Sequence, residues 1–272
     1  MSVLWVARLE LLIARRNMWV ATSVLLMALF TVVLTLAGAA PAGVTGVDPL
    51  TVAITSITTL SVYLIPLIGL LLSYDAIAGE AERGTLALSL SYPLSRGEIL
   101  LGKFLAHFCV LAFAVAVGLA LTGALVVWRH GAGGLDFAPL FRLFGTSLAL
   151  GAAFLGVGYL VSALVRQPGA ASGVVIAVWL VSVVLYDLGL LGALVADGGG
   201  TFTRSVFPWV LVANPADAFR LLNMAEISSP VLTTGLSAAG SVSGLAGQLT
   251  SLLVWPVVTL VLAWSVFRKV EP

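Results

Sequence analysis

Residues 171–196 read A-S-G-V-V-I-A-V-W-L-V-S-V-V-L-Y-D-L-G-L-L-G-A-L-V-A, with Asp187 as the one charged residue of the run. A helix that crosses the ~30 Å hydrocarbon core of a membrane needs about 20 mostly apolar residues. The run is long enough, and it lacks the ten-residue alternation that marks a membrane β-strand. It therefore predicts a transmembrane α-helix.

Five further apolar stretches of this kind lie on either side of it. We predict an all-α integral membrane protein with six transmembrane helices at 18–39, 52–73, 101–128, 141–165, 171–196 and 249–267. The composition agrees, because 60% of the 272 residues are hydrophobic and only 9% are charged. An average soluble domain has about 25% charged residues, and a disordered chain is far more polar. No stretch between the spans could form a separate soluble domain, so 1–272 is treated as a single transmembrane domain.

The basic residues are unevenly divided between the two sides that six spans define. With both termini inside, the inner segments hold nine of them: Arg8, Arg15, Arg16, Arg83, Arg96, Lys103, Arg166, Arg268 and Lys269. The outer segments hold Arg129, Arg142, Arg204 and Arg220. The positive-inside rule therefore predicts a multi-pass protein of the cytoplasmic (inner) membrane with both termini cytoplasmic and an N-terminal interfacial segment before the first span.

The first span could be mistaken for a secretory signal, because Ala37-Gly38-Ala39 resembles a cleavage site. A signal has an apolar region of only ~7–15 residues. The apolar run is longer here, which favours an uncleaved first helix.

Residues that could bind a cofactor or a metal are scarce. Gly97 to Lys103 fits the first seven positions of a phosphate-binding loop, but Phe104 replaces the required hydroxyl residue. Ser95 and Glu98 instead form a capping box that starts a helix, from which Lys103 would snorkel to the inner interface. The chain has one Cys and two His. We interpret His107 as an isolated packing residue, and we expect no catalytic residue, no metal, no cofactor and no nucleic-acid partner.

The inner segment 74–100 holds the densest group of charges, namely Asp75, Glu80, Glu82 and Arg83. It continues with Leu86-Ala87-Leu88-Ser89-Leu90 and breaks at Tyr92-Pro93. A solvated loop needs no such leucines, so an amphipathic piece at the membrane interface is favoured. Such a piece would offer a rigid contact to a cytoplasmic partner.

Polar residues within the spans are few, and each leaves two interpretations open. An Asp at the centre of a membrane helix costs about 2.5–3.5 kcal/mol, so Asp187, beside Tyr186, is either a gate residue or part of a buried structural hydrogen bond. Thr51, Thr55, Thr58 and Thr59 share one face of the second span. They could line a polar path, although packing between helices is favoured. Ala152 and Gly156 form a small-residue step that predicts close helix packing.

The outer loop 197–248 is longer than a simple connection needs. Asn214-Pro215 is typical of a helix start, and Asp217 would then lie in the first turn. Phe219, Leu222 and Trp209 would bury one side of this region and leave Arg220 and Asn223 available. We expect a docking site for an extracytoplasmic partner; the alternative is a lid that only packs on the membrane domain.

Residues 74–103 resemble a known signature. They read Y-D-A-I-A-G-E-A-E-R-G-T-L-A-L-S-L-S-Y-P-L-S-R-G-E-I-L-L-G-K. ABC-2 type permeases show the similar pattern E-x-x-x-G-T-L-x-x-L-L-x-x-P-x-x-R-x-x-x-L-x-G-K. Tyr186-Asp187 and the run N-P-A-D-A-F-R-L-L-N at 214–223 are similar to Nos-type permeases, the membrane subunits of the ABC transporter that serves maturation of nitrous oxide reductase. The similarity extends over nearly the whole chain.

This resemblance implies a set of partners and roles. Two copies of the permease would pair with a cytoplasmic ABC ATPase dimer that carries ATP and Mg²⁺, and membrane lipid would surround them. A periplasmic β-helical protein, and through it a copper chaperone, would act on the outer side. The process served is assembly of the copper site in denitrification, by mechanical transmission or by export of a sulfur species. The low number of Cys, Met and His argues against direct passage of copper. The alternatives are an ABC-2 exporter of a lipid-like or drug-like compound and a non-transporting membrane scaffold.

Together with the placement of the polar residues, the resemblance predicts roles for three groups of residues. The ATPase-coupling group is Asp75, Glu80, Glu82, Arg83, Gly84, Thr85 and Arg96. The transmembrane polar or gate group is Asp187, Tyr186, Thr55 and Thr58. The group for docking of the periplasmic partner is Asn214, Pro215, Asp217, Arg220 and Asn223.

Overall fold

The computed structural model describes residues 2–14, 18–38, 49–131, 133, 135–165, 167–224 and 236–270. Predictions that concern Arg15, Arg16, Ala39, Arg166 and the middle of the 197–248 loop fall partly or wholly outside these residues. Within them the chain is helical throughout, and no strand is formed.

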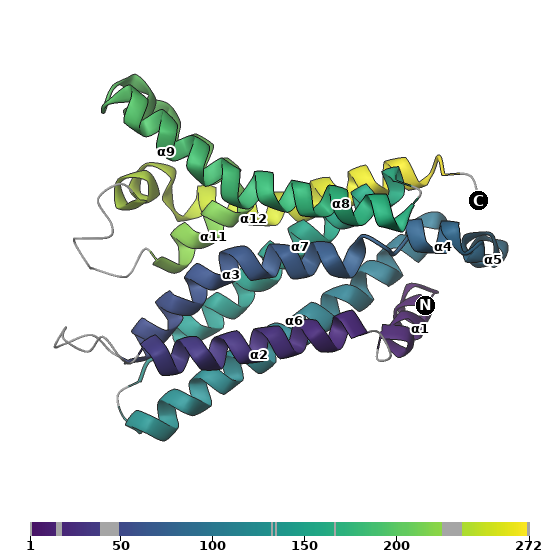
Figure 1. Cartoon of the computed structure of the whole chain (residues 1–272), viewed down its shortest axis with the longest axis horizontal. Coiled ribbons are helices and arrows are strands. Elements are labelled where there is room, and N and C mark those ends of the chain that lie inside the picture. The colour runs from purple at the N-terminus through teal and green to yellow at the C-terminus, as the bar shows by residue number, and fades with distance from the viewer. Residues whose placement is uncertain are drawn as a thin grey trace.

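The molecule is a bundle of long helices that run side by side (Figure 1). Among the residues that the structure describes, five helical stretches are long and apolar enough to cross a membrane. They are α3 with its extension through α4 (Leu50–Glu82), α6 (Arg96–His130), α7 (Ala138–Leu164), the continuous helix Pro168–Asp197, and the Gly244–Phe267 part of α12. α2 (Met18–Gly38) lies beside them, and its stretch Val20–Leu36 is apolar but shorter. The predicted all-helical membrane class is confirmed.

The bounds of these helices differ from the predicted spans mainly at their ends. α3 begins at Pro49 and ends at Ser73, and α12 extends over Leu236–Phe267 with a kink at Gly244. The fifth predicted span consists of α8 (Pro168–Trp179), a π-helical segment η1 (Leu180–Leu185) and α9 (Tyr186–Asp197). Pro66 and Pro256 lie inside helices, as their positions in the predicted spans implied.

α7 is the central helix of the bundle, and most of its residues are buried against α3, α6 and α12. Its glycine Gly156 faces Thr259 of α12 so closely that a Cβ on residue 156 would lie 2.1 Å from the threonine Oγ1. A larger residue would therefore push α12 away. This contact confirms the close packing that the small-residue step predicts.

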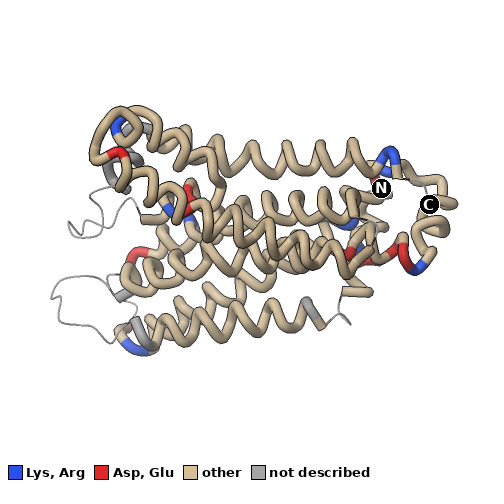
Figure 2. Tube along the Cα trace, turned by 45° about the horizontal axis from the view of Figure 1, so that its top comes forward, with Lys and Arg blue, Asp and Glu red and all other residues tan. Residues whose placement is uncertain are grey.

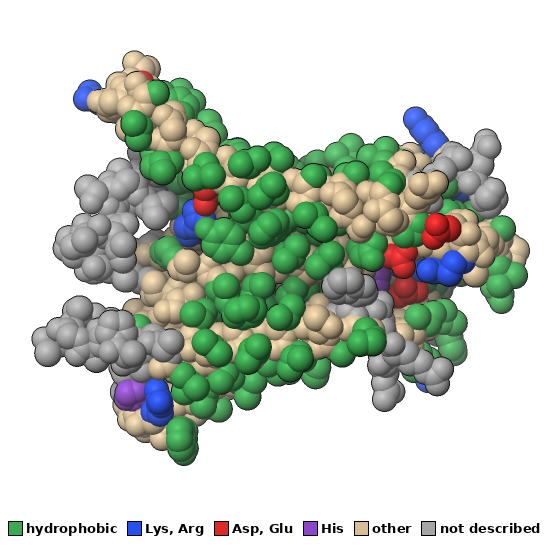
Figure 3. All heavy atoms as spheres, in the orientation of Figure 1, with side chains coloured by type: hydrophobic (Ala, Val, Ile, Leu, Met, Phe, Trp, Pro, Cys, Tyr) green, Lys and Arg blue, Asp and Glu red, His purple; other side chains and the backbone are tan. Residues whose placement is uncertain are grey.

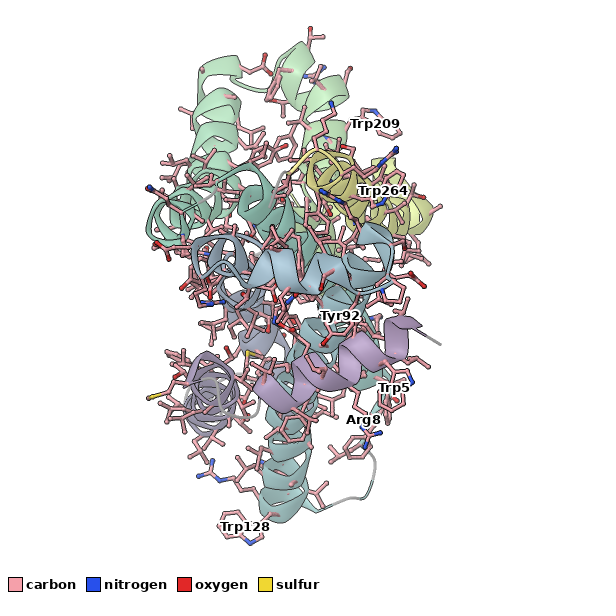
Figure 4. The ribbon with its side chains drawn as sticks, turned by 90° about the vertical axis from the view of Figure 1, so that its right-hand side faces the viewer. Trp5, Arg8, Tyr92, Trp128, Trp209 and Trp264 are labelled. Carbon is pink, nitrogen blue, oxygen red and sulfur yellow. The ribbon has the colours of Figure 1, made fainter. Side chains whose placement is uncertain are left out.

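Both ends of the chain lie at the same end of the bundle, together with α1 (Ser2–Ala14), α4 (Ala78–Glu82) and α5 (Thr85–Ser91) (Figure 1). α1 lies across this end rather than along the bundle, and Trp5 and Arg8 project outward from it (Figure 4). We call this the α1 end. At the opposite end the predicted outer loop forms its own helices η2 (Phe202–Val206), α10 (Phe207–Ala213) and α11 (Pro215–Met224).

The charged residues of the described chain gather toward the two ends of the long helices, and the middle of the bundle is apolar (Figure 2). Hydrophobic side chains cover the face between the two ends (Figure 3). This distribution is the one that a bilayer requires, because a charge in the hydrocarbon region is costly.

Candidate functional sites at the two ends of the bundle

At the α1 end, residues 74–95 form a bent connection between α3 and α6, which we call the inner elbow. The hydroxyl of Ser162 on α7 accepts hydrogen bonds from the backbone N–H groups of Ile77, at 2.9 Å, and Ala78, at 3.0 Å. It therefore satisfies donors that the start of α4 would leave unpaired. Gly84, with φ 70°, turns the chain from α4 into α5, a conformation that favours glycine.

The elbow has one anchored side and one open side. Leu86 is buried, whereas Leu88 is 65% and Tyr92 61% exposed. The predicted amphipathic piece thus has an inner contact at Leu86 and an apolar outer edge. The end-on view shows Tyr92 beside α1 (Figure 4).

The predicted coupling residues divide into an exposed and an internal group. Glu82, Arg83, Gly84 and Thr85 are exposed, and Arg83 forms a 3.6 Å ion pair with the half-exposed Asp75. Arg96 instead turns inward, where its Nη1 donates to the carbonyl oxygens of Phe267 at 2.7 Å and Val270 at 2.5 Å. Its guanidinium group thereby holds the end of α12 and does not contribute to an outer contact surface.

Glu80 is the second internal residue, and it belongs to a buried group that we call the inner ion cluster: Glu10, Glu80, Lys103, His107 and Tyr159. The ammonium of Lys103 lies 2.7 Å from Glu80 Oε1 and 3.0 Å from Glu10 Oε2. Tyr159 Oη and His107 Nδ1 are 2.7 Å apart, and His107 Nε2 is 3.9 Å from Glu10 Oε1. The cluster joins α1, α4, α6 and α7. Charged side chains gather visibly at this end (Figure 3).

Two expectations about this region are wrong. Lys103 does not snorkel to the interface, because its side chain is only 6% exposed and is held by two carboxylates. His107 is not an isolated packing residue, because it bonds Tyr159. Glu10 received no role from sequence reasoning. The signal for the cluster was the spacing of Lys103 and His107, which are four apart and so share one face of an apolar helix.

At the opposite end, two groups that sequence reasoning separated lie together in what we call the outer clasp: Tyr186, Asp187, Asn214, Asp217 and Arg220. Arg220 Nη2 donates to Asp187 Oδ2 at 2.8 Å, and Nη1 donates to Asp217 Oδ1 at 2.9 Å. The hydroxyl of Tyr186 donates to the carbonyl of Val210 at 2.5 Å. The clasp thus ties α9 of the fifth span to α10 and α11.

The clasp also uses the π-helical segment of the fifth span. A π-turn leaves backbone carbonyls displaced from the regular ladder, and such turns are frequent at functional sites. Asn214 Nδ2 donates to the carbonyl of Ser182 within η1 at 2.7 Å, while Asn214 Oδ1 accepts from Ala216 N at 2.9 Å. One side chain therefore starts α11, as predicted for Asn214-Pro215, and holds η1 at the same time.

Burial changes the acidity of the clasp. Burial of Asp217, reinforced by the negative charge of Asp187, raises the pKa of Asp217 to about 7, although Arg220 opposes the shift. Asp217 is 1% exposed. The proton that Asp217 binds is therefore held more tightly in the folded clasp than by an ordinary aspartate.

The docking residues are less accessible than we expected. Asn214, Pro215, Asp217 and Asn223 are buried, and the side chain of Arg220 is only 16% exposed. Asn223 donates to Thr146 Oγ1 of α7 at 2.9 Å. Phe219 and Leu222 are buried as expected, but Trp209 is 58% exposed. Trp209, which we expected to be buried, is therefore outward, while Arg220 and Asn223, which we expected to be available, are engaged inside the chain.

The threonines of the second span use their hydroxyls within α3. Thr55 donates to the carbonyl of Thr51 and Thr58 to that of Ile54, both at 2.8 Å. Thr58 is fully buried. A gate role for these two residues, and for Tyr186 and Asp187, stays a prediction. Among the described residues, no group of three or more His, Cys, Asp and Glu could hold a metal ion.

Comparison with known proteins is consistent with this geometry. Residues 4–271 match the family described as ABC-2 family transporter protein. The chain is 39% identical over 279 residues to the "Probable ABC transporter permease protein NosY" of Stutzerimonas stutzeri, with 99% of both chains covered. It is 38% identical over 280 residues to the protein of the same name from Pseudomonas aeruginosa, again with 99% of both chains covered. Since the match extends over the whole bundle, from α1 through the elbow and the clasp to the end of α12, the chain belongs to the ABC-2 family of transporter permeases.

Proposed function

We propose that this chain is the six-span permease subunit of an inner-membrane ABC transporter, with both termini cytoplasmic and a separate ATPase acting on the inner elbow. Permeases of this kind work with an ATPase partner and are not themselves catalytic. The observation that carries the proposal is the exposed stretch Glu82–Thr85, which stands at the α1 end on a support of buried polar contacts.

A displacement of the elbow can be transmitted to the bundle through several of these contacts. Glu80 is bonded to Lys103 of α6, which is also bonded to Glu10 of α1. Ser162 leads to α7, and Arg96 leads from the start of α6 to the end of α12. Because buried ion pairs and capped helix ends resist separation, a displaced elbow would move these helices together with it.

The same helices reach the outer clasp. α11 packs against α3, α7 and α12, and Asn223 bonds Thr146 of α7. A shift of α7 or α12 would therefore displace α11. Through Arg220, the displacement of α11 would reach the fifth span. We infer that the clasp transmits the movement to a periplasmic partner, and that Trp209, exposed on α10, is part of the contact surface.

The assembly would contain a second copy of the chain. The fifth predicted span and α12 bury only 11% and 17% of their most apolar windows, so their apolar faces are free to meet another helix or lipid. We propose that these two helices face the second permease. Interfaces within membranes are formed by such close-packing apolar surfaces.

The process served is, in our proposal, maturation of the copper site of nitrous oxide reductase. Its support is the resemblance of 74–103, 186–187 and 214–223 to Nos-type permeases and the names of the two relatives. We propose mechanical transmission or export of a sulfur species, with a periplasmic β-helical protein and a copper chaperone outside. The small stock of one Cys, two His and four Met supports a role other than a copper conduit.

A charge reversal on the open side of the elbow tests the coupling. Glu82→Lys should weaken association with the ATPase about tenfold or more, because like charges placed opposite each other in an interface are strongly unfavourable. The membrane-inserted complex should then show ATP hydrolysis that no longer supports reductase maturation. Arg129→Glu, a reversal of an exposed charge at the other end of α6, is the matched control and should leave association unchanged. Normal coupling in Glu82→Lys would contradict the proposed contact.

The scarcity of side chains that could bind copper leads to a direct prediction. Replacing Cys109 and His130, which lie outside the inner ion cluster, by Ser and Gln should leave the copper content of the reductase largely unchanged. Loss of the copper site in this double variant would contradict a mechanical or sulfur-species role. His107 is better left in place, because its removal would also disturb Tyr159.

A further inference from the structure

A hollow of about 610 Å³ opens on the side of the bundle where α1, α2 and α6 meet. It is lined by side chains of all three helices: Leu11 and Ala14 of α1, Val20, Ala21, Val24, Leu25 and Ala28 of α2, and Cys109, Val110 and Phe113 of α6. Every lining side chain is a hydrocarbon except the thiol of Cys109. We call this hollow the side groove.

The side groove has the length and position of one membrane leaflet. Eight residue steps separate Val20 from Ala28, which corresponds to about 12 Å along a helix. Half of the hydrocarbon core is about 15 Å thick. The lining residues of the groove begin with Leu11 and Ala14 of α1 and continue along α2 as far as Ala28, in the middle of that helix. It is therefore open to the acyl region of the leaflet at the α1 end.

We propose that the side groove holds an acyl chain of one phospholipid from this leaflet. The site would retain the lipid more firmly than the surrounding bilayer does, because three helices line it. Its volume lies within the roughly 300–1,000 Å³ of typical small-ligand sites. The proposal goes beyond the function argued above and does not depend on it.

The chemistry of the lining excludes the other occupants. A peptide or a polar cargo would bring hydrogen-bonding groups that the hydrocarbon walls cannot satisfy, at a cost of several kcal/mol each. A helix of a second copy is too large, since a cylinder about 10 Å wide and 12 Å long occupies roughly 900 Å³. A slender, apolar acyl chain has neither problem.

The position of the groove gives the lipid a structural consequence. α1 lines the groove with Leu11 and Ala14, and the same helix presents Glu10 to Lys103. A chain lodged between α1 and α2 would thus pack against the side of α1 that carries Leu11 and Ala14. Exposed Leu12 and Ile13 extend the apolar edge of α1 toward the same leaflet.

Photo-crosslinking in a defined bilayer tests the proposal. The full chain is placed in nanodiscs of phosphatidylethanolamine and phosphatidylglycerol that contain a phospholipid with a diazirine on its acyl chain. After illumination, lipid adducts should concentrate on the α6 peptide around Cys109 and Phe113. Ala21→Phe or Ala28→Phe fills the groove and should lower this adduct about tenfold. Ala120→Phe, at an exposed α6 position outside the groove, is the matched control and should have no effect.

Three results would overturn the inference. Adducts spread evenly over other exposed apolar residues, such as Leu188 and Val257, would mean that only bulk lipid contacts this surface. An unchanged adduct in both filling variants would place the lipid elsewhere. Crosslinks between Cys109 residues of two chains would assign the groove to a second copy. Ala21 is exposed, so Ala21→Phe adds no volume to the core and should still insert.

Discussion

At the scale of single residues, the ammonium of Lys103 connects more of the molecule than any charge we singled out from the sequence. It lies between Glu10 of α1 and Glu80 of α4 and is itself buried on α6. Two carboxylates and one ammonium can remain buried only while they satisfy one another. The stability of the α1 end should therefore depend on this one side chain.

We predict that Lys103→Met lowers the free energy of unfolding by about 3–5 kcal/mol, because it leaves Glu10 and Glu80 buried without their cation. Thermal unfolding of the detergent-solubilised protein measures the loss. Lys103→Arg keeps the charge and should restore most of the stability. If Lys103→Met melted like the unaltered protein, the cluster would have no role in holding α1 and α4.

Asp217 should make stability depend on pH. Its folded pKa is raised from 3.8 to about 7, mainly by burial, so the folded chain binds this proton more tightly than the unfolded chain does. The resulting stabilisation is complete below about pH 4 and is lost as the pH rises through 7. The charged groups around it are Arg220 and Asp187.

We predict that Asp217→Asn, which keeps the side chain neutral, flattens this pH dependence. At pH 8 the variant should melt about 2–4 °C above the unaltered protein, the shift that 1 kcal/mol causes in a chain of this size. The difference should shrink as the pH falls, and the two should melt together only below about pH 4, where Asp217 is protonated in the folded and the unfolded chain alike. A parallel pH profile for both proteins would show that Asp217 is charged in the folded state throughout the range.

At the scale of elements, the inner elbow is held to the bundle mainly through the start of α4. Ser162→Ala removes the shared acceptor of Ile77 N–H and Ala78 N–H. Leaving a buried donor unsatisfied costs about 1–3 kcal/mol. We predict faster amide hydrogen exchange in residues 77–82, measured by mass spectrometry. Ser172→Ala, which removes an exposed hydroxyl bonded to Gly169 O within its own turn, is the control and should leave the elbow unchanged.

The elements that sequence reasoning located well are those that neighbouring residues determine. Ser95 and Glu98 form the predicted capping box at the start of α6, and Asn214 begins α11. Both signals lie within four residues of chain. The existence of the long helices likewise follows from the length of the apolar runs, because long uninterrupted runs of this kind indicate transmembrane helices.

The contacts that sequence reasoning missed join residues far apart in the chain. Arg96 bonds carbonyls of Phe267 and Val270, more than 170 positions away. The π-helical segment is bonded by Asn214, which is 32 positions from Ser182. A local pattern could identify Glu80, Arg96 and Arg220 as noteworthy charges. It could not show that each of these side chains turns inward. Their partners are set by the packing of whole helices.

At the scale of the whole molecule, the arrangement makes a testable statement about topology. α1, the elbow and the end of α12 share one end of the bundle, while α10 and α11 lie at the other (Figure 1). In the sequence, the segments predicted to lie inside hold nine basic residues and those predicted to lie outside hold four. α2 lies parallel to the five longer helical stretches and would complete an even number of crossings.

Cysteine accessibility decides this topology. In a Cys109→Ser background, single cysteines replace two exposed residues, Ser91 of the elbow and Thr201 beside η2. A membrane-impermeant maleimide applied to intact cells should label Thr201→Cys and leave Ser91→Cys unlabelled until the membrane is permeabilised. Labelling of Ser91→Cys alone would invert the orientation and place the elbow beyond the reach of a cytoplasmic ATPase. Labelling of both in intact cells would mean an even number of crossings between them, with one of the α6, α7 or Pro168–Asp197 helices failing to span. Only the predicted pattern leaves the elbow inside and the clasp outside, which the proposed transmission requires.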